Sequence, residues 1–209
     1  MAVNSTQIES SVFCHRGLWG TSARQNSLES FDIAFKSGFS IETDIRHFEE
    51  KAVISHDIPS GAGLPQLEML TRLKTSFALN IKEDGLQEFF VQVRSWIETS
   101  NSFVFDGSIP EMFQYRKLGI QHALRLSEFE KTIPWQSGHI WLDSFREDWW
   151  LKDDSLLEIL EGSHVVVVSP ELHGRDPRFV WDFLAEKRSK GRFDFSICTD
   201  RPLEYLSWK

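Results

Sequence analysis

Two acidic residues, Glu42 and Asp44, stand two positions apart within the apolar segment 39–45. Because side chains alternate along an extended segment, both carboxylates point to the same face. Two buried carboxylates repel each other unless a cation joins them, and such oxygen ligands suit Mg²⁺ or Ca²⁺. On a buried face the pair therefore indicates a divalent-metal site, whereas on an exposed face it is an ordinary solvated strand end.

Two histidines follow other short apolar segments. His15 is followed directly by Arg16 and Gly17, and His56 ends the segment 52–56. An imidazole changes its charge near neutral pH and serves general acid–base catalysis, while a guanidinium binds phosphate oxygens in a fork. A glycine after this pair lets the backbone turn sharply. Taken singly, either histidine is more commonly a structural group, so the hypothesis depends on what else reaches the same place.

Apolar and amphipathic segments alternate along the whole chain. Strands are predicted at 11–15, 39–45, 77–81, 102–105, 122–126, 139–143, 164–169 and 192–198, with a short extended continuation at 52–56. Helices are predicted at 26–38, 64–73, 86–100, 109–119, 155–162 and 178–191. Apolar strands that alternate with helices predict a parallel sheet covered on both faces, and eight such units predict an α/β fold of the compact (β/α)8 TIM-barrel type. An open doubly wound sheet is the alternative, although no glycine-rich phosphate fingerprint supports it.

Composition narrows the classes of function. The chain has 209 residues, which we expect to form one domain over 1–209, and a net charge of −8. This charge argues against a nucleic-acid partner and against stable association with an anionic membrane. The chain has two cysteines, no visible signal peptide and no apolar run long enough to span a membrane, so we expect a cytoplasmic protein with reduced thiols. The sequence does not indicate an oligomeric state.

The barrel hypothesis brings separated residues together, because the carboxyl ends of its strands share one rim, where active sites lie. We expect the following polar residues at that rim: His15, Arg16, Glu42, Asp44, His56, Asp57, Asn80, Lys82, Asp106, Asp143, Glu171, Thr199 and Asp200. His122, His139 and His164 begin strands and are expected at the opposite end, in structural roles. We expect His47 in a solvated turn.

Five segments in this order resemble the glycerophosphodiester phosphodiesterase family, which belongs to the PLC-like phosphodiesterases on TIM barrels. They are HRG (15–17), NSLESFDIAFKSG (26–38), IETD (41–44), HD (56–57) and TDRP (199–202). The spacing from His15 to Glu42 is 27 residues and from Glu42 to His56 is 14 residues, both of which fit the family. The specific match covers the first quarter of the chain, and the rest agrees mainly in the order of strands and helices.

The resemblance implies a metal-dependent phosphoric diester hydrolase that cleaves a small, glycerophosphodiester-like substrate into an alcohol and a phosphomonoester. It implies an acid–base pair, a divalent metal site and contacts to the phosphate. The implied residues are His15 and His56 for proton transfer, Glu42 and Asp44 for Mg²⁺ or Ca²⁺, and Arg16, Lys82 and Asn26 for binding the substrate and fixing the loop beside it.

The chain departs from the family pattern at three places. Asn80 stands where a metal-binding glutamate is expected, and its amide oxygen can coordinate a cation but brings no charge. Either the metal affinity is lower, or another carboxylate such as Glu171 or Asp143 also coordinates the metal. Gln25 replaces a common acidic residue, and the segment after His56 is short, which implies a smaller or more open pocket. The alternative is therefore a non-catalytic barrel protein that binds a phosphorylated ligand at a weakened metal site.

Overall fold

The computed structural model describes residues 11–20, 22–61, 63–152, 156, 160, 162–189 and 195–208. Its strands are β1 (Val12–His15), β2 (Ser40–Phe48), β3 (Lys51–Ile54), β4 (Phe77–Ile81), β5 (Phe103–Phe105), β6 (Ala123–Leu126), β7 (His139–Leu142), β8 (His164–Val168) and β9 (Phe195–Thr199). Its α-helices are α2 (Leu28–Lys36), α3 (Gln87–Gln92), α4 (Arg94–Thr99), α5 (Ile109–Lys117), α7 (Arg178–Ser189) and α8 (Pro202–Ser207). Three short 3₁₀ helices are η1 (Leu67–Arg72), η2 (Trp149–Lys152) and η3 (Pro170–His173).

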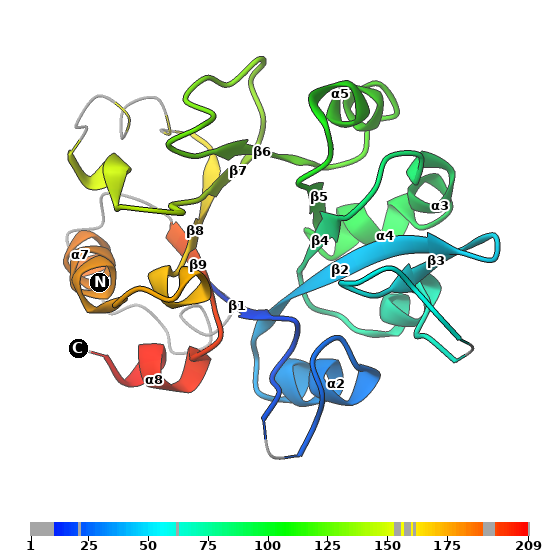
Figure 1. Ribbon diagram of the computed structural model, residues 1–209, viewed down its shortest axis with the longest axis horizontal. Helices are drawn as coiled ribbons and strands as arrows, with labels where there is room; N and C mark the ends of the chain where they lie inside the picture. The colour runs from blue at the N-terminus through cyan, green and yellow to red at the C-terminus, as the bar shows by residue number, and fades with distance from the viewer. Residues whose placement is uncertain are drawn as a thin grey trace.

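Eight of the described strands form a parallel barrel. Their order is β5-β4-β2-β1-β9-β8-β7-β6, and a parallel bridge between Val104 and His122 joins β5 to the start of β6. Figure 1 looks down this ring of strands, with the helices around its outside. The predicted (β/α)8 barrel is thus confirmed, and the open doubly wound sheet is excluded. Strand β3 is not part of the ring, because it pairs antiparallel with the far end of β2.

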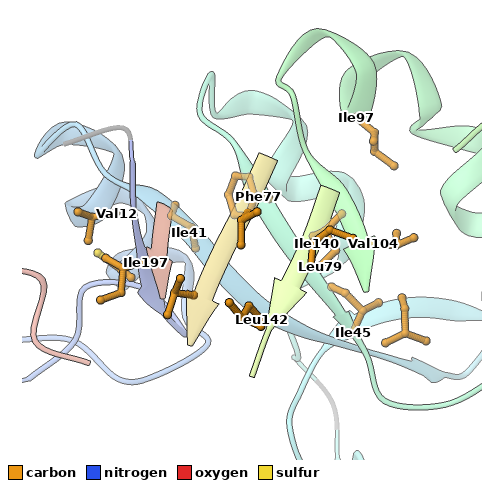
Figure 2. Packing of buried hydrophobic residues seen from close by; sticks show 14 of the residues in the cluster. Val12, Ile41, Ile45, Phe77, Leu79, Ile97, Val104, Ile140, Leu142 and Ile197 are labelled. Atoms are coloured by element: carbon orange, nitrogen blue, oxygen red, sulfur yellow. The ribbon is translucent and has the colours of Figure 1, made fainter. Parts of the chain in front are cut away.

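Two apolar layers hold the barrel together. The layer inside the barrel is formed by Phe13, Ala78, Phe103, Phe105, Ala123, Trp141, Val166, Val168 and Cys198. The layer between strands and helices contains the residues labelled in Figure 2, which are Val12, Ile41, Ile45, Phe77, Leu79, Ile97, Val104, Ile140, Leu142 and Ile197. Alternating side chains of the same strands supply both layers, which explains why these strands are apolar almost throughout.

Helix α2, which the sequence predicted within 26–38, has a defined cap at each end. The Ser27 hydroxyl accepts a hydrogen bond from the backbone N–H of Ser30, and the Ser30 side chain accepts one from the backbone N–H of Ser27, which forms a capping box. At the other end, Gly38 has a φ of 82°, a left-handed conformation that glycine adopts without a Cβ penalty. This helix fixes the position of the loop that returns from the first strand.

Two predicted helices differ from the observed ones. In the segment 64–73, Gln66 forms an antiparallel β-bridge with Val53, and the carbonyl of Pro65 accepts a hydrogen bond from the N–H of Ile54. The start of this segment is therefore extended, and only the short η1 follows. The segment 86–100 divides into α3 and α4 at Val93, a β-branched residue with φ −105° and ψ 12°. The helix predicted at 155–162 lies largely outside the described residues. Helix α8, which Pro202 starts, was not predicted.

Within the described residues, no helix combines the length and the apolar character needed to cross a membrane.

Candidate active site

The carboxyl end of the barrel brings four of the predicted site residues onto one interior face. His15 of β1 is paired in register with Glu42 of β2, and Asp44 of β2 with Asn80 of β4. Glu42 and Asp44 are each 1% exposed. The two carboxylates therefore meet the condition of burial under which their spacing indicates a cation site.

His15 lies between two carboxylates. Its Nδ1 is 2.8 Å from an oxygen of Asp200, and its Nε2 is 3.9 Å from an oxygen of Glu42. Burial alone would lower the pKa of His15, but the hydrogen bond to Asp200 and the charges of Glu42 and Asp200 outweigh it and raise this pKa. A carboxylate that accepts from Nδ1–H leaves Nε2 as the proton acceptor. Asp200 had no predicted role, although its place after the last strand, beside the first strand of a closed barrel, was a usable signal.

The two buried carboxylates have opposite electrostatic surroundings. Asp44 is 3.0 Å from Nε of Arg16 and 3.1 Å from Nζ of Lys82, whereas Glu42 accepts a 3.1 Å hydrogen bond from the backbone N–H of Arg16. Burial, followed by the charge of Asp44, raises the pKa of Glu42 to about 7. Burial would also raise the pKa of Asp44, but the charge of Lys82 and the hydrogen bond from Asn26 outweigh it and lower this pKa. Of the two carboxylates, Asp44 is therefore the one that keeps its negative charge at the lower pH.

The loop after β1 is locked to the site by Asn26. Its amide donates to Asp44 over 2.8 Å, and its amide oxygen accepts from the hydroxyl of Thr43 over 2.8 Å. Its backbone N–H also donates to the carbonyl of Arg16. Asn26 and Arg16 both have positive φ, 54° and 58°, which marks a tight turn held by these bonds. Asn26 therefore lies where it can fix the loop, and Thr43 is a supporting residue not identified from the sequence.

Hydrogen bonds to the backbone hold His56 at the same rim of the barrel. The N–H of Ser55 donates to the carbonyl of Asp44, and Nε of Arg46 donates to the carbonyl of His56 over 2.9 Å. The side chain of His56 is 45% exposed, and its Nδ1 is 2.8 Å from Asp57. The backbone at His56 is therefore held beside Asp44 while its imidazole remains accessible to solvent.

Asn80 and Glu171, the two other candidate metal ligands, have different surroundings. The side-chain oxygen of Asn80 is buried and has no hydrogen-bond partner among the described residues. Both carboxylate oxygens of Glu171 accept hydrogen bonds, from the hydroxyls of Ser169 and Thr199. Within the described residues, no three His, Cys, Asp or Glu side chains gather closely enough to hold a metal ion. A third oxygen beside Glu42 and Asp44 would therefore come from the Asn80 amide.

Further charged pairs line the opposite side of the rim. Nε2 of His173 is 2.7 Å from Asp143, and Arg125 is 2.9 Å from Asp106. Burial raises the pKa of Asp106, while the charges of Arg125 and Lys82 act in the opposite direction. His173 was missed because it does not end a strand; it lies in η3, directly after β8.

The other end of the barrel contains the three histidines that were expected there. His139 and His164 are paired in register at the starts of β7 and β8, and the indole N–H of Trp135 donates to His122. Burial lowers the pKa of His139 to about 4. A cavity of about 660 Å³ opens at this end, with His164 in its wall. His47, expected in a turn, lies in β2 with its side chain exposed.

Comparison with known proteins shows which solved structures share the fold of this chain. No protein-family model matches the chain, and no curated protein matches it. Among solved structures, it is similar to a glycerophosphodiester phosphodiesterase from Agrobacterium tumefaciens str. C58, with a TM-score of 0.69 and 16% identity over 94% of this chain and 98% of the other. It is also similar to a glycerophosphoryl diester phosphodiesterase from Parabacteroides distasonis ATCC 8503, with a TM-score of 0.51 and 17% identity over 93% of this chain and 84% of the other. The chain has the barrel fold of these proteins, as the sequence resemblance implied.

Proposed function

We propose that the protein is a metal-dependent phosphodiesterase that hydrolyses a small, glycerophosphodiester-like substrate to an alcohol and a phosphomonoester. One observation carries the proposal: His15, bonded to Asp200, faces the buried pair Glu42 and Asp44 at the carboxyl rim of the barrel. The solved structures that share this barrel are named as enzymes of this class, which supports the same activity for this chain.

The chain's own groups supply proton transfer and charge. Asp200 orients the imidazole of His15, whose Nε2 accepts a proton from the attacking hydroxyl. Attack by water gives the phosphomonoester directly, whereas attack by a hydroxyl of the substrate gives a cyclic phosphate that water must then open. Arg16 and Lys82 bring two positive charges to Asp44, and we propose that they bind the phosphate oxygens. His56, beside Asp44 through its backbone, donates a proton to the departing alcohol.

The residues present fit a divalent cation. Glu42 and Asp44 offer buried carboxylates, and Asn80 offers a buried amide oxygen with no hydrogen-bond partner in the described part of the chain. Such an all-oxygen donor set suits Mg²⁺ or Ca²⁺. When bound, the ion would stabilise negative charge on the phosphate oxygens.

The proposed class of substrate and the proposed cellular location rest on composition. The net charge of −8 supports a soluble small-molecule substrate rather than a nucleic acid or an anionic membrane. The two free, buried cysteines, Cys14 and Cys198, agree with a reducing, cytoplasmic location.

The proposal is tested by measuring diester hydrolysis with Mg²⁺, Ca²⁺ or chelator. Suitable substrates are bis(p-nitrophenyl) phosphate and several glycerophosphodiesters. We expect metal-dependent turnover in the wild type, a loss of at least about 100-fold in His15→Ala, which removes a general base, and a comparable loss in Glu42→Ala. His47→Ala is the matched control, because His47 is exposed on β2 and lies outside the site. Turnover that survives in His15→Ala would refute the assignment.

A second function is favoured by the amide at Asn80. With one carboxylate fewer, the site would hold a cation weakly, and the barrel would bind a phosphorylated ligand without cleaving it. Calorimetric titration with Mn²⁺ and with glycerol phosphate separates the two possibilities. Phosphate-ester binding without turnover and without metal binding would favour the binding protein.

A further inference from the structure

The loops that follow β6, β7 and β8 meet in an aromatic cluster on the rim. The ring centroids of Phe129 and Phe145 are 5.8 Å apart, and those of Phe145 and His173 are 4.8 Å apart. Phe129 is 61% exposed. Three segments distant in sequence thus build one surface, and an exposed aromatic residue on it is available for a ligand.

Arginine side chains already lie over both phenylalanine rings. The guanidinium of Arg146 is 5.1 Å from the ring centroid of Phe129, and that of Arg125 is 5.9 Å from the centroid of Phe145. A quaternary ammonium ligand is bound through the face of such a ring. Because the chain's own cations lie over these faces, a quaternary ammonium ligand would have to displace them.

The two arginines differ in how their charge is balanced. Arg125 forms ion pairs with Asp106 and Glu130. Arg146 forms no ion pair with any described residue, and its side chain is exposed. Arg146 therefore supplies positive charge that a ligand can neutralise.

The carboxylate nearest to the backbone of Arg146 is already engaged. The two oxygens of Glu128 accept hydrogen bonds from the N–H groups of Phe145 and Arg146, over 3.1 Å and 2.6 Å. These bonds hold the loop after β7 against the loop after β6. They fix the backbone of Arg146 while its guanidinium rests on Phe129, which makes the cation pre-organised.

This surface adjoins the phosphate-binding side of the rim. Asp106 interacts electrostatically with Lys82 on one side and is 2.9 Å from Arg125 on the other. Arg125 in turn lies over Phe145. A diester whose phosphate is bound near Lys82 can therefore extend its alcohol group past Asp106 toward Arg146.

We propose that Arg146, with Phe129 and Phe145, forms the subsite for the alcohol part of the substrate, and that this alcohol carries an anionic group such as a carboxylate. The proposal rests on the proposed phosphodiesterase function and names the substrate class of the same site. Because arginines already lie over the two rings, we expect choline-type alcohols to bind more weakly.

Three diesters of glycerol phosphate, whose alcohols are negatively charged, neutral and positively charged, test this. Their alcohols are 3-hydroxypropanoate, propanol and choline. We expect a KM for the carboxylate diester about tenfold below that for the choline diester, and we expect Arg146→Gln to abolish the difference with little change in kcat. Arg116→Gln is the matched control, since Arg116 also lies over an aromatic ring, 5.6 Å from the centroid of Trp135, at the other end of the barrel. This control should keep the preference.

Calorimetric binding of the same diesters to His15→Ala separates this inference from the proposed function. Cleavage that depends on His15 but shows no charge preference, or a preference that survives in Arg146→Gln, would refute the subsite and leave the phosphodiesterase intact. Charge-selective binding lost in Arg146→Gln, without turnover in the wild type, would support the subsite and refute the enzyme. The absence of both binding and cleavage would refute both.

Discussion

Replacing Gly17 with alanine should destabilise the protein through two separable effects. Gly17 has a φ of 87°, and an added Cβ would lie 2.4 Å from the hydroxyl oxygen of Ser30 and 2.9 Å from Cδ1 of Phe31. The left-handed backbone costs about 1–2 kcal/mol for a residue with a Cβ, and overpacking a filled site costs about 1–3 kcal/mol more. We therefore expect the free energy of unfolding to fall by about 2–5 kcal/mol in Gly17→Ala.

A second glycine isolates the backbone effect. Gly61 has nearly the same φ, 89°, but no described atom lies within 4 Å of the position its Cβ would take. Gly61→Ala should therefore lose only about 1–2 kcal/mol. Urea unfolding of both variants and the wild type gives the difference directly. An equal loss in the two variants would show that Ser30 and Phe31 yield without cost and would refute the close packing of this turn.

Three further changes probe the site and the barrel. Asp200→Asn should lower the pKa of His15, because it removes a negative charge that raises this pKa and leaves only a neutral hydrogen-bond acceptor, and an NMR titration of the imidazole measures the shift. Burial lowers the pKa of His139 from 6.5 to about 4. The stability that the neutral imidazole provides is therefore complete above pH 6.5 and is lost as the pH falls toward 4. At 1.36 kcal/mol for each pKa unit, the loss is about 3 kcal/mol. Unfolding measured at pH 7 and pH 4.5 should therefore show a smaller difference in His139→Phe than in the wild type, and equal differences would contradict the assignment. Asn80→Asp should strengthen Mn²⁺ binding in a calorimetric titration about tenfold or more, because the added charge attracts the ion, whereas unchanged affinity would place Asn80 outside the cation site.

The barrel could be predicted because its strands are nearly continuous apolar segments separated by helical ones. The carboxyl ends of parallel strands must share a rim, so the proximity of His15, Glu42 and Asp44 followed from the strand assignment alone. Whether Glu42 and Asp44 are buried depends on the tertiary structure. Their spacing could therefore predict a cation site only on the condition that both lie on a buried face. The pairing of Asp44 with Lys82 was not predicted, since it depends on how side chains from neighbouring strands bend over the rim.

Residues in loops were harder to predict than residues on strands. His173 and Arg146 lie after strands, in segments where no hydrophobic period indicates direction. Their partners, Asp143 and Phe129, are about 30 and 17 residues away in sequence, so only the folded chain reveals the contacts. The break of the predicted helix 86–100 falls at Val93, a β-branched residue whose restricted side chain the helical spacing of the apolar residues did not reveal.

The joint between β5 and β6 has a mechanical consequence. In the described chain a single bridge, Val104 to His122, closes the ring there, whereas β1 and β9 are joined by three register pairs. Local unfolding begins where the fewest backbone bonds must break, so amide hydrogens at this seam should exchange before those of the other ladders. Lys82, which we propose binds the phosphate, follows β4 on one side of the seam, and Arg125 lies in β6 on the other. Opening and closing of this joint would therefore change the distance between the two sides of the seam, which the proposed substrate has to span.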